Sequence, residues 1–107
     1  MPLAYSHESH MFRVDGDVLE TFIMGESRQR VLLAWLAVQV FPYTRGYLAL
    51  QIGSAPPDMP LYEVSQKAKA MTGRGTTVQV TISPEEEPVL REFFTQVAQL
   101  CGRPMVP

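Results

Sequence analysis

The stretch VQVFPYTRGYLALQI, residues 38–52, predicts a β-hairpin that folds about a three-residue turn. Gly46 ends the turn Thr44-Arg45-Gly46, at the position where such a turn needs a residue in the left-handed conformation. Folding the chain about this turn places Tyr43 opposite Tyr47, Gln39 opposite Gln51, and the intervening residues in matching pairs. The hairpin is therefore specified by its turn and by the pattern on both sides of it.

The two faces of this hairpin differ in character. Apart from Pro42, one face is purely aliphatic and predicts a core surface: Val38, Val40, Leu48, Leu50 and Ile52. The other face mixes aromatic residues with glutamines, as half-buried antiparallel pairs do. The run Val31–Tyr43, which includes the first strand of the hairpin, could also be read as a helix. Its content of Val, Trp, Phe and Tyr and the turn that follows it favour a strand.

Further short strands are predicted on both sides of the hairpin. Asp15-Gly16-Asp17 is a turn between two strands, and residues 76–82 alternate apolar and polar without interruption. Residues 65–75 form a loop in this reading, with one possible helical turn at 67–70. The predicted strands number about seven, and the others cover Phe12–Val14, Val18–Met24, Arg28–Leu33 and Leu61–Val64.

After residue 82 the pattern changes to that of an amphipathic helix, predicted over 84–101. Ser83 and Pro84 with the acidic run Glu85–Glu87 suit a helix start, and Gly102 suits its end. Pro88 leaves the first helical residue open, because a proline deep in a helix removes a hydrogen bond. The apolar stripe comprises Leu90, Phe93, Phe94, Val97, Leu100 and Cys101.

These elements predict one α+β domain: a small antiparallel β-barrel or two-sheet sandwich capped by a C-terminal helix. A chain of 107 residues with 46% hydrophobic residues has the size and composition of a single globular domain. We expect a flexible segment at 1–10, the domain at 11–102 and a tail at 103–107.

The order of strands followed by one helix resembles a bacterial pleckstrin-homology-like domain family found in actinobacterial proteins. Residues 30–33, 36–40, 46–48 and 76–82 carry this resemblance, which spans roughly residues 12 to 102. It implies a barrel whose helix plugs one open end, and an adaptor role. Lipid-binding relatives hold phosphate with basic residues at the first hairpin turn. Here that turn contains Asp15 and Asp17, which would repel phosphate.

Composition excludes several classes of function. The net charge of −2 gives no global basic field for nucleic acid. One cysteine allows no intrachain disulfide, and the longest apolar run, Val31–Val38, is too short to span a membrane. Residues 1–9 lack the pattern of a signal peptide, so we expect a cytoplasmic protein.

Few residues could carry catalysis. His7, Glu8 and His10 have the donor types of a metal site, but two histidines in one polar segment fit a solvated terminus better. Cys101 lies on the apolar stripe and is read as a core residue. Glu85–Glu87 could be an acid–base pair, but helix-dipole compensation explains the run more simply. We therefore expect no enzyme, no cofactor and no metal.

Two surfaces remain as candidate binding sites. The aromatic set Trp35, Phe41, Tyr43 and Tyr47 would share one hairpin face, either as core or as a protein interface. Lys67, Lys69 and Arg74 form the one basic cluster, either a solvated loop or an anion site. The leading hypothesis is a non-enzymatic interaction or scaffold module that binds a protein partner or forms a homodimer. The alternative is a membrane-surface or anionic-ligand binder that uses the basic loop.

Overall fold

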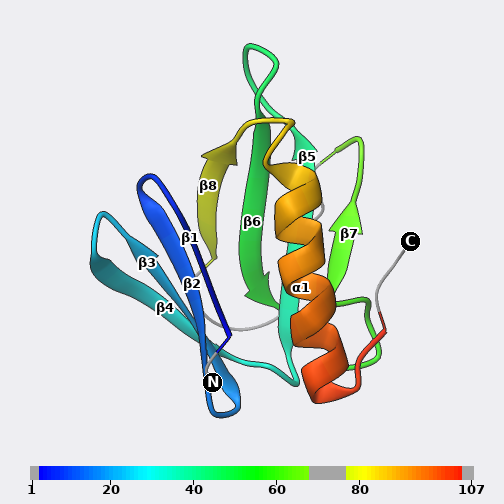
Figure 1. Cartoon of the computed structure of the whole chain (residues 1–107). Helices are drawn as coiled ribbons and strands as arrows, with labels where there is room; N and C mark the ends of the chain where they lie inside the picture. The colour runs from blue at the N-terminus through cyan, green and yellow to red at the C-terminus, as the bar shows by residue number, and fades with distance from the viewer. Residues whose placement is uncertain (1–2, 68–76, 105–107) are drawn as a thin grey trace.

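In a computed structural model, the chain forms two four-stranded sheets and one helix (Figure 1). The structure describes residues 3–67 and 77–104. The first sheet has the order β1-β2-β3-β4, with β1 at Ala4–His7, β2 at His10–Asp15, β3 at Val18–Ile23 and β4 at Glu26–Leu32. The second sheet has the order β7-β5-β6-β8, with β5 at Leu36–Pro42, β6 at Leu48–Ser54, β7 at Tyr62–Val64 and β8 at Val78–Ile82. Helix α1, Glu87–Cys101, follows β8.

The predicted α+β class with a C-terminal helix is confirmed, whereas three details differ. Residues 3–67 and 77–104 contain eight strands instead of about seven, and β7 pairs with β5 in the parallel direction. Within the described residues, no strand pairing joins the two sheets, so the architecture there is a sandwich and not a closed barrel. The parallel pair forms because residues 55–61, which carry three prolines, cross from the end of β6 to the other side of β5 near the start of β5. From there β7 runs in the same direction as β5.

The additional strand, β1, lies in the segment expected to be a flexible lead-in. Ala4–His7 pair antiparallel with β2 around the two-residue turn Glu8-Ser9. This strand has only one half-buried side chain, Tyr5, whereas its neighbours are exposed. A strand that buries so little carries no hydrophobic alternation, and this is why the sequence pattern did not reveal it.

The register predicted for the central hairpin is confirmed along its whole length. Gln39 pairs with Gln51 and Val40 with Leu50 in β5 and β6, and Gly46 adopts a φ of +79° in the turn. The long strand expected across Val31–Tyr43 is wrong, because a turn at residues 33–35 separates β4 from β5. In that turn, the Trp35 amide donates to the carbonyl of Leu32.

The aliphatic hairpin face lies in the core, as predicted. It packs with the helix and the first sheet around Phe94 and Phe12, both of which are fully buried. Figure 1 shows α1 lying across the face of the second sheet, beside the edge strand β1. The helix therefore covers the core of the sandwich on its open side.

The helix differs from its predicted bounds at the start. It begins at Glu87 instead of residue 84, and residues 83–86 form a turn in which the Glu86 amide donates to the carbonyl of Ser83. Pro88 accounts for this start, since proline is tolerated in the first helical turn but not deeper. Leu100, expected in the buried stripe, is exposed, and Cys101 is half-buried against the core. Among the described residues, none of the helical segments has the length and apolarity needed to cross a membrane.

Candidate functional site

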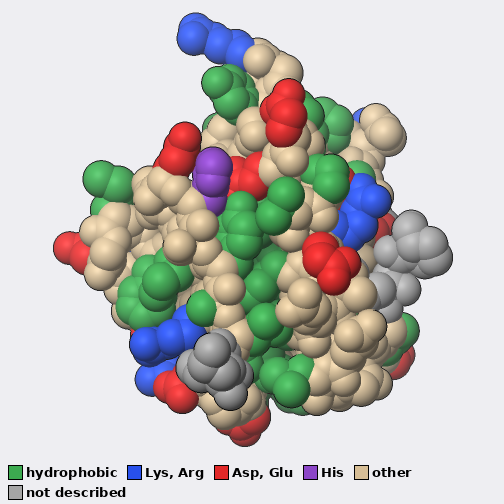
Figure 2. Space-filling view, viewed as in Figure 1, with side chains coloured by type: hydrophobic (Ala, Val, Ile, Leu, Met, Phe, Trp, Pro, Cys, Tyr) green, Lys and Arg blue, Asp and Glu red, His purple; other side chains and the backbone are tan. Residues whose placement is uncertain are grey.

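The turn of the β5–β6 hairpin projects beyond the body of the molecule (Figure 1), and the space-filling view in Figure 2 shows the same projection. Tyr43 and Tyr47 flank this turn with 51% and 48% of their surface exposed. The Tyr43 amide donates to the carbonyl of Tyr47 at 2.9 Å, and the Tyr47 amide donates to the carbonyl of Thr44 at 3.0 Å. The backbone that carries the two phenol rings is therefore fixed by its own hydrogen bonds.

We define the hairpin tip as Pro42, Tyr43, Thr44, Arg45, Gly46 and Tyr47, which are all exposed. Arg45 holds a φ of +57°, a left-handed conformation that is uncommon for a side chain other than glycine, asparagine or aspartate. Within the described residues, Arg45 forms no ion pair. The tip thus offers two aromatic rings and an uncompensated guanidinium, which are residue types enriched where binding energy concentrates in protein interfaces.

The structure divides the aromatic set that was predicted as one surface. Phe41 is 8% exposed and belongs to the interior. It does so although it lies two residues before Tyr43, a spacing that places both side chains on the same side of the chain. Trp35 is half-exposed but lies in the turn before β5, at the opposite end of that strand from Tyr43. Only the two tyrosines of the set are both exposed and adjacent, because the strand break at residues 33–35 removes Trp35 from the hairpin.

The basic cluster is described in part. Lys67 is exposed and its carbonyl accepts a hydrogen bond from the Ser65 hydroxyl at 2.9 Å. Lys69 and Arg74 lie outside the described residues, as do residues 68–70 of the possible helical turn at 67–70. Anion binding by this loop stays a prediction.

A buried polar cluster joins the first hairpin to the start of the helix. The Tyr5 hydroxyl donates to Glu86 Oε2 at 2.6 Å, and His10 Nε2 lies 2.7 Å from the same oxygen. His10 is 5% exposed, so the solvated terminus expected for it is wrong, whereas His7 is exposed. Burial and the hydrogen bond to Glu86 raise the pKa of Tyr5 above its ordinary value. The cluster holds β1 and β2 against the helix.

The next carboxylate along the chain makes the equivalent connection to the second sheet. The buried hydroxyl of Tyr62 in β7 donates to Glu87 Oε2 at 2.8 Å, and Arg91 Nε donates to the same oxygen at 3.0 Å. Burial and Glu87 raise the pKa of Tyr62, and the bond to Glu87 raises the pKa of Arg91. The acidic run interpreted as dipole compensation therefore contains two structural carboxylates.

His7, Glu8 and His10, the residues with the donor types of a metal site, lie near this cluster. His7 and His10 have ring centroids 5.9 Å apart, and His7 Nε2 lies 3.8 Å from Glu8 Oε1. Across residues 3–67 and 77–104, no three His, Cys, Asp or Glu side chains are grouped so that they could hold a metal ion. The Cys101 thiol contacts the Ala98 carbonyl at 3.7 Å, within its own helix.

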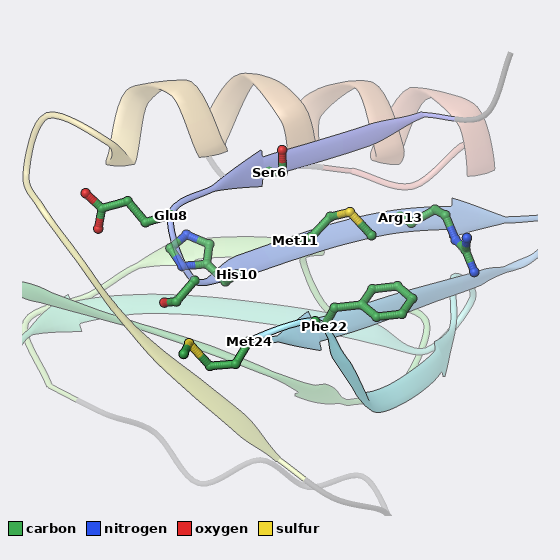
Figure 3. Close-up of a pocket in the computed structure, with 9 residues that line it drawn as sticks. Ser6, Glu8, His10, Met11, Arg13, Phe22 and Met24 are labelled. Atoms are coloured by element: carbon green, nitrogen blue, oxygen red, sulfur yellow. The ribbon is translucent and has the colours of Figure 1, made fainter.

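The outer face of the first sheet carries a shallow hollow of about 580 Å³ (Figure 3). Met11, Phe22 and Met24 supply its apolar lining, and the guanidinium of Arg13 lies 5.2 Å from the centre of the Phe22 ring. Arg13 Nη2 also donates to Glu20 Oε1 at 2.7 Å. Glu20 neutralises this arginine, so the charged group at the hollow without such a close ion pair is the exposed carboxylate of Glu8.

Glu20 is the centre of a small network on that face. Its second oxygen accepts from the Ser27 hydroxyl at 2.6 Å. The bonds from Ser27 and Arg13 lower the pKa of the Glu20 carboxyl. This network ties β2, β3 and β4 together and explains a buried glutamate on an outward face.

Comparison of the chain with protein-family models, curated proteins and solved structures gives no match. Sequence reasoning identified the two tyrosines of the hairpin tip but missed the role of Tyr5 and His10. Their partner, Glu86, lies more than 70 residues away, and no local spacing signals that contact.

Proposed function

We propose that this chain is a non-enzymatic protein-interaction module whose hairpin tip is the partner-binding surface. The observation that carries the proposal is the pair of half-exposed tyrosines, Tyr43 and Tyr47, on a projecting and hydrogen-bonded turn. The half-buried Tyr5 and the buried Tyr62 donate their hydroxyls to Glu86 and Glu87, whereas about half of the surface of Tyr43 and Tyr47 is open to solvent. Exposed tyrosine supplies large contact area at low conformational cost.

The hydrogen bonding of the tip supports the same proposal. Two backbone bonds, from Tyr43 to Tyr47 and from Tyr47 to Thr44, close the turn without a partner, which lowers the conformational entropy lost on binding. The unpaired Arg45 between the two rings favours a partner surface that is acidic or rich in carbonyl oxygens. We also propose that the chain is related to pleckstrin-homology-like domains. The order of its elements supports this relationship, because a series of strands is followed by one helix that covers the core.

The test compares proteins that co-purify from cells with the wild-type chain and with a Tyr43→Ser/Tyr47→Ser variant. We expect the variant to stay folded by circular dichroism and to lose partners that the wild type retains. Trp35→Ser is the matched control, because Trp35 is equally exposed but lies at the other end of β5. Equal recovery of the same partners by the tip variant and the wild type would contradict the proposal.

A further inference from the structure

Among the described residues, strand β8 is one of the two edge strands of the second sheet, and its outward hydrogen-bonding groups can be identified. In the β5–β6 hairpin, the bond from Tyr43 to Tyr47 marks the odd-numbered pairs as hydrogen-bonded pairs. The even-numbered residues of β6 therefore direct their backbone groups toward β8, where Leu50 pairs with Val80 and Ile52 with Val78. It follows that Gln79 and Thr81 direct their N–H and C=O groups away from the sheet.

These outward groups have no backbone partner among the described residues. Within that part of the chain, β8 pairs with β6 alone, and both Gln79 and Thr81 are exposed. An exposed strand edge of this kind is a template for another strand.

The sequence of β8, VQVTI, is complementary to itself in the antiparallel direction. Pairing two copies about Val80 places Gln79 of one copy opposite Thr81 of the other, so that their outward groups form a hydrogen-bonded pair on each side of the axis. Val78 then lies opposite Ile82 of the second copy on the apolar face. No charged residue occurs in β8, so this pairing opposes no like charges.

The other three sheet edges are less suited to such pairing. β4 carries Glu26, Arg28 and Arg30, and its pairing with β3 shifts register between Thr21 and Phe22. Charged side chains and bulges are devices that prevent an edge from adding a strand. β1 and β7 have four and three residues, and β1 lies beside α1 (Figure 1). The longest uncharged and regular edge is β8.

We propose that two copies of this chain associate through β8, antiparallel about Val80, so that their two four-stranded sheets become one continuous sheet. The occupant of the edge is a second copy, because the five residues match their own reverse in hydrogen bonding, side-chain size and charge. The contact has two-fold symmetry and is smaller than a standard protein interface, so the dimer dissociates on dilution. This surface is separate from the hairpin tip.

The experiment measures the molar mass of the whole chain by light scattering over a series of concentrations. We expect the mass to rise with concentration from 12.0 kDa toward twice that value. Gln79→Pro removes one outward N–H and leaves the bonds to β6 in place, and Thr81→Lys adds a charge to the edge. Both variants should remain monomeric at concentrations where the wild type is dimeric, while Gln96→Lys on the exposed face of α1 should not change the mass.

A second measurement keeps the proposal testable if a substitution disturbs folding. Hydrogen exchange at the amides of Gln79 and Thr81 should slow as the wild-type concentration rises, while exchange at the Tyr43 and Tyr47 amides should not. A wild type that stays at 12.0 kDa, or a dimer that survives in both edge variants, overturns the proposal. Loss of the dimer in Tyr43→Ser/Tyr47→Ser alone would overturn it too, since that result assigns self-association to the hairpin tip.

Discussion

The neighbouring carboxylates of Glu86 and Glu87 connect the helix start to different sheets. Glu86 accepts from Tyr5 of the first sheet at 2.6 Å, and Glu87 accepts from Tyr62 of the second sheet at 2.8 Å. Two adjacent residues thus fasten both layers of the sandwich to one end of α1. Both carboxylates are buried, so water does not readily replace one that is removed. Its loss leaves a tyrosine hydroxyl without an acceptor, and an unsatisfied buried hydroxyl lowers stability.

The first prediction concerns Glu86. Glu86→Ala removes the acceptor of both Tyr5 and His10, and we expect it to lower the free energy of unfolding by about 2 to 4 kcal/mol. Glu85→Ala is the control, because Glu85 is exposed, and its effect should stay within about 0.5 kcal/mol. Urea unfolding of both variants measures the difference. If the two variants are equally stable, the buried hydrogen bonds of Glu86 make no net contribution to the free energy of unfolding.

The second prediction concerns alkaline pH. The pKa values of Tyr5 and Tyr62 are raised in the folded chain, whereas in the unfolded chain they lie near their usual value of about 10. Above that pH the unfolded state releases protons that the folded state retains, so stability falls as pH rises. Thermal unfolding between about pH 8 and 11 should show this decline. A Tyr5→Phe/Tyr62→Phe variant should show a shallower decline, and an unchanged slope would refute the assignment.

The third prediction separates the two histidines. His10→Ala removes a buried ring that contacts Glu86 and packs on Phe12 with centroids 5.6 Å apart, and should cost about 1 to 3 kcal/mol. His7→Ala alters an exposed side chain and should change stability by less than about 0.5 kcal/mol. Chemical denaturation of the two variants provides the comparison. A larger loss for His7→Ala would mean that the terminal hairpin packs differently.

The fourth prediction tests the docking of the helix. Phe94 is fully buried against Phe12, Tyr62 and Phe93, so Phe94→Ala should lower stability by about 3 to 5 kcal/mol. Val89→Ala on the same helix changes a side chain that is 55% exposed and should have little effect. Calorimetric melting of both variants measures this contrast, and an unchanged melting temperature for Phe94→Ala would remove α1 from the core.

The fifth prediction concerns the turn between β3 and β4. Met24 and Gly25 have φ values of +54° and +81°, which is the left-handed pair of a type I′ hairpin turn. Asparagine suits the first position far better than methionine, so Met24→Asn should raise stability by up to about 1 kcal/mol. Met24→Leu keeps the same backbone penalty and should not stabilise the chain. A thermal shift assay distinguishes the two substitutions.

The success and failure of sequence-based prediction follow from the range of the interactions involved. The register of β5 and β6 was predictable because the turn Thr44-Arg45-Gly46 and a period of two fix it locally. The turn at 33–35 was not, because it contains no glycine, proline or asparagine. Trp35 was therefore assigned to a hairpin face that it does not share.

The candidate site divides in the same way. The length of the turn predicts that Tyr43 and Tyr47 lie opposite each other. Whether their rings are exposed or buried is known only from the structure. β1 was missed because Ala4–His7 become a strand through pairing with β2 and through the Tyr5–Glu86 bond. Glu86 belongs to the run interpreted as dipole compensation, since nothing in the residues around it indicates its two partners in the first hairpin, Tyr5 and His10.

The bond between Tyr5 and Glu86 spans 81 residues and so has a kinetic consequence. The first hairpin can form by itself, but its edge strand gains its helix contact only after every later strand and the start of α1 have been made. Contacts of such long sequence separation slow folding, and small β-rich domains that depend on them fold in about milliseconds to seconds. On the ribosome, where the chain grows by roughly 5 to 20 residues per second, Tyr5 waits several seconds for its acceptor. During that interval β1 is held only by its pairing with β2, and its outer edge is open to a chaperone or to a neighbouring nascent chain.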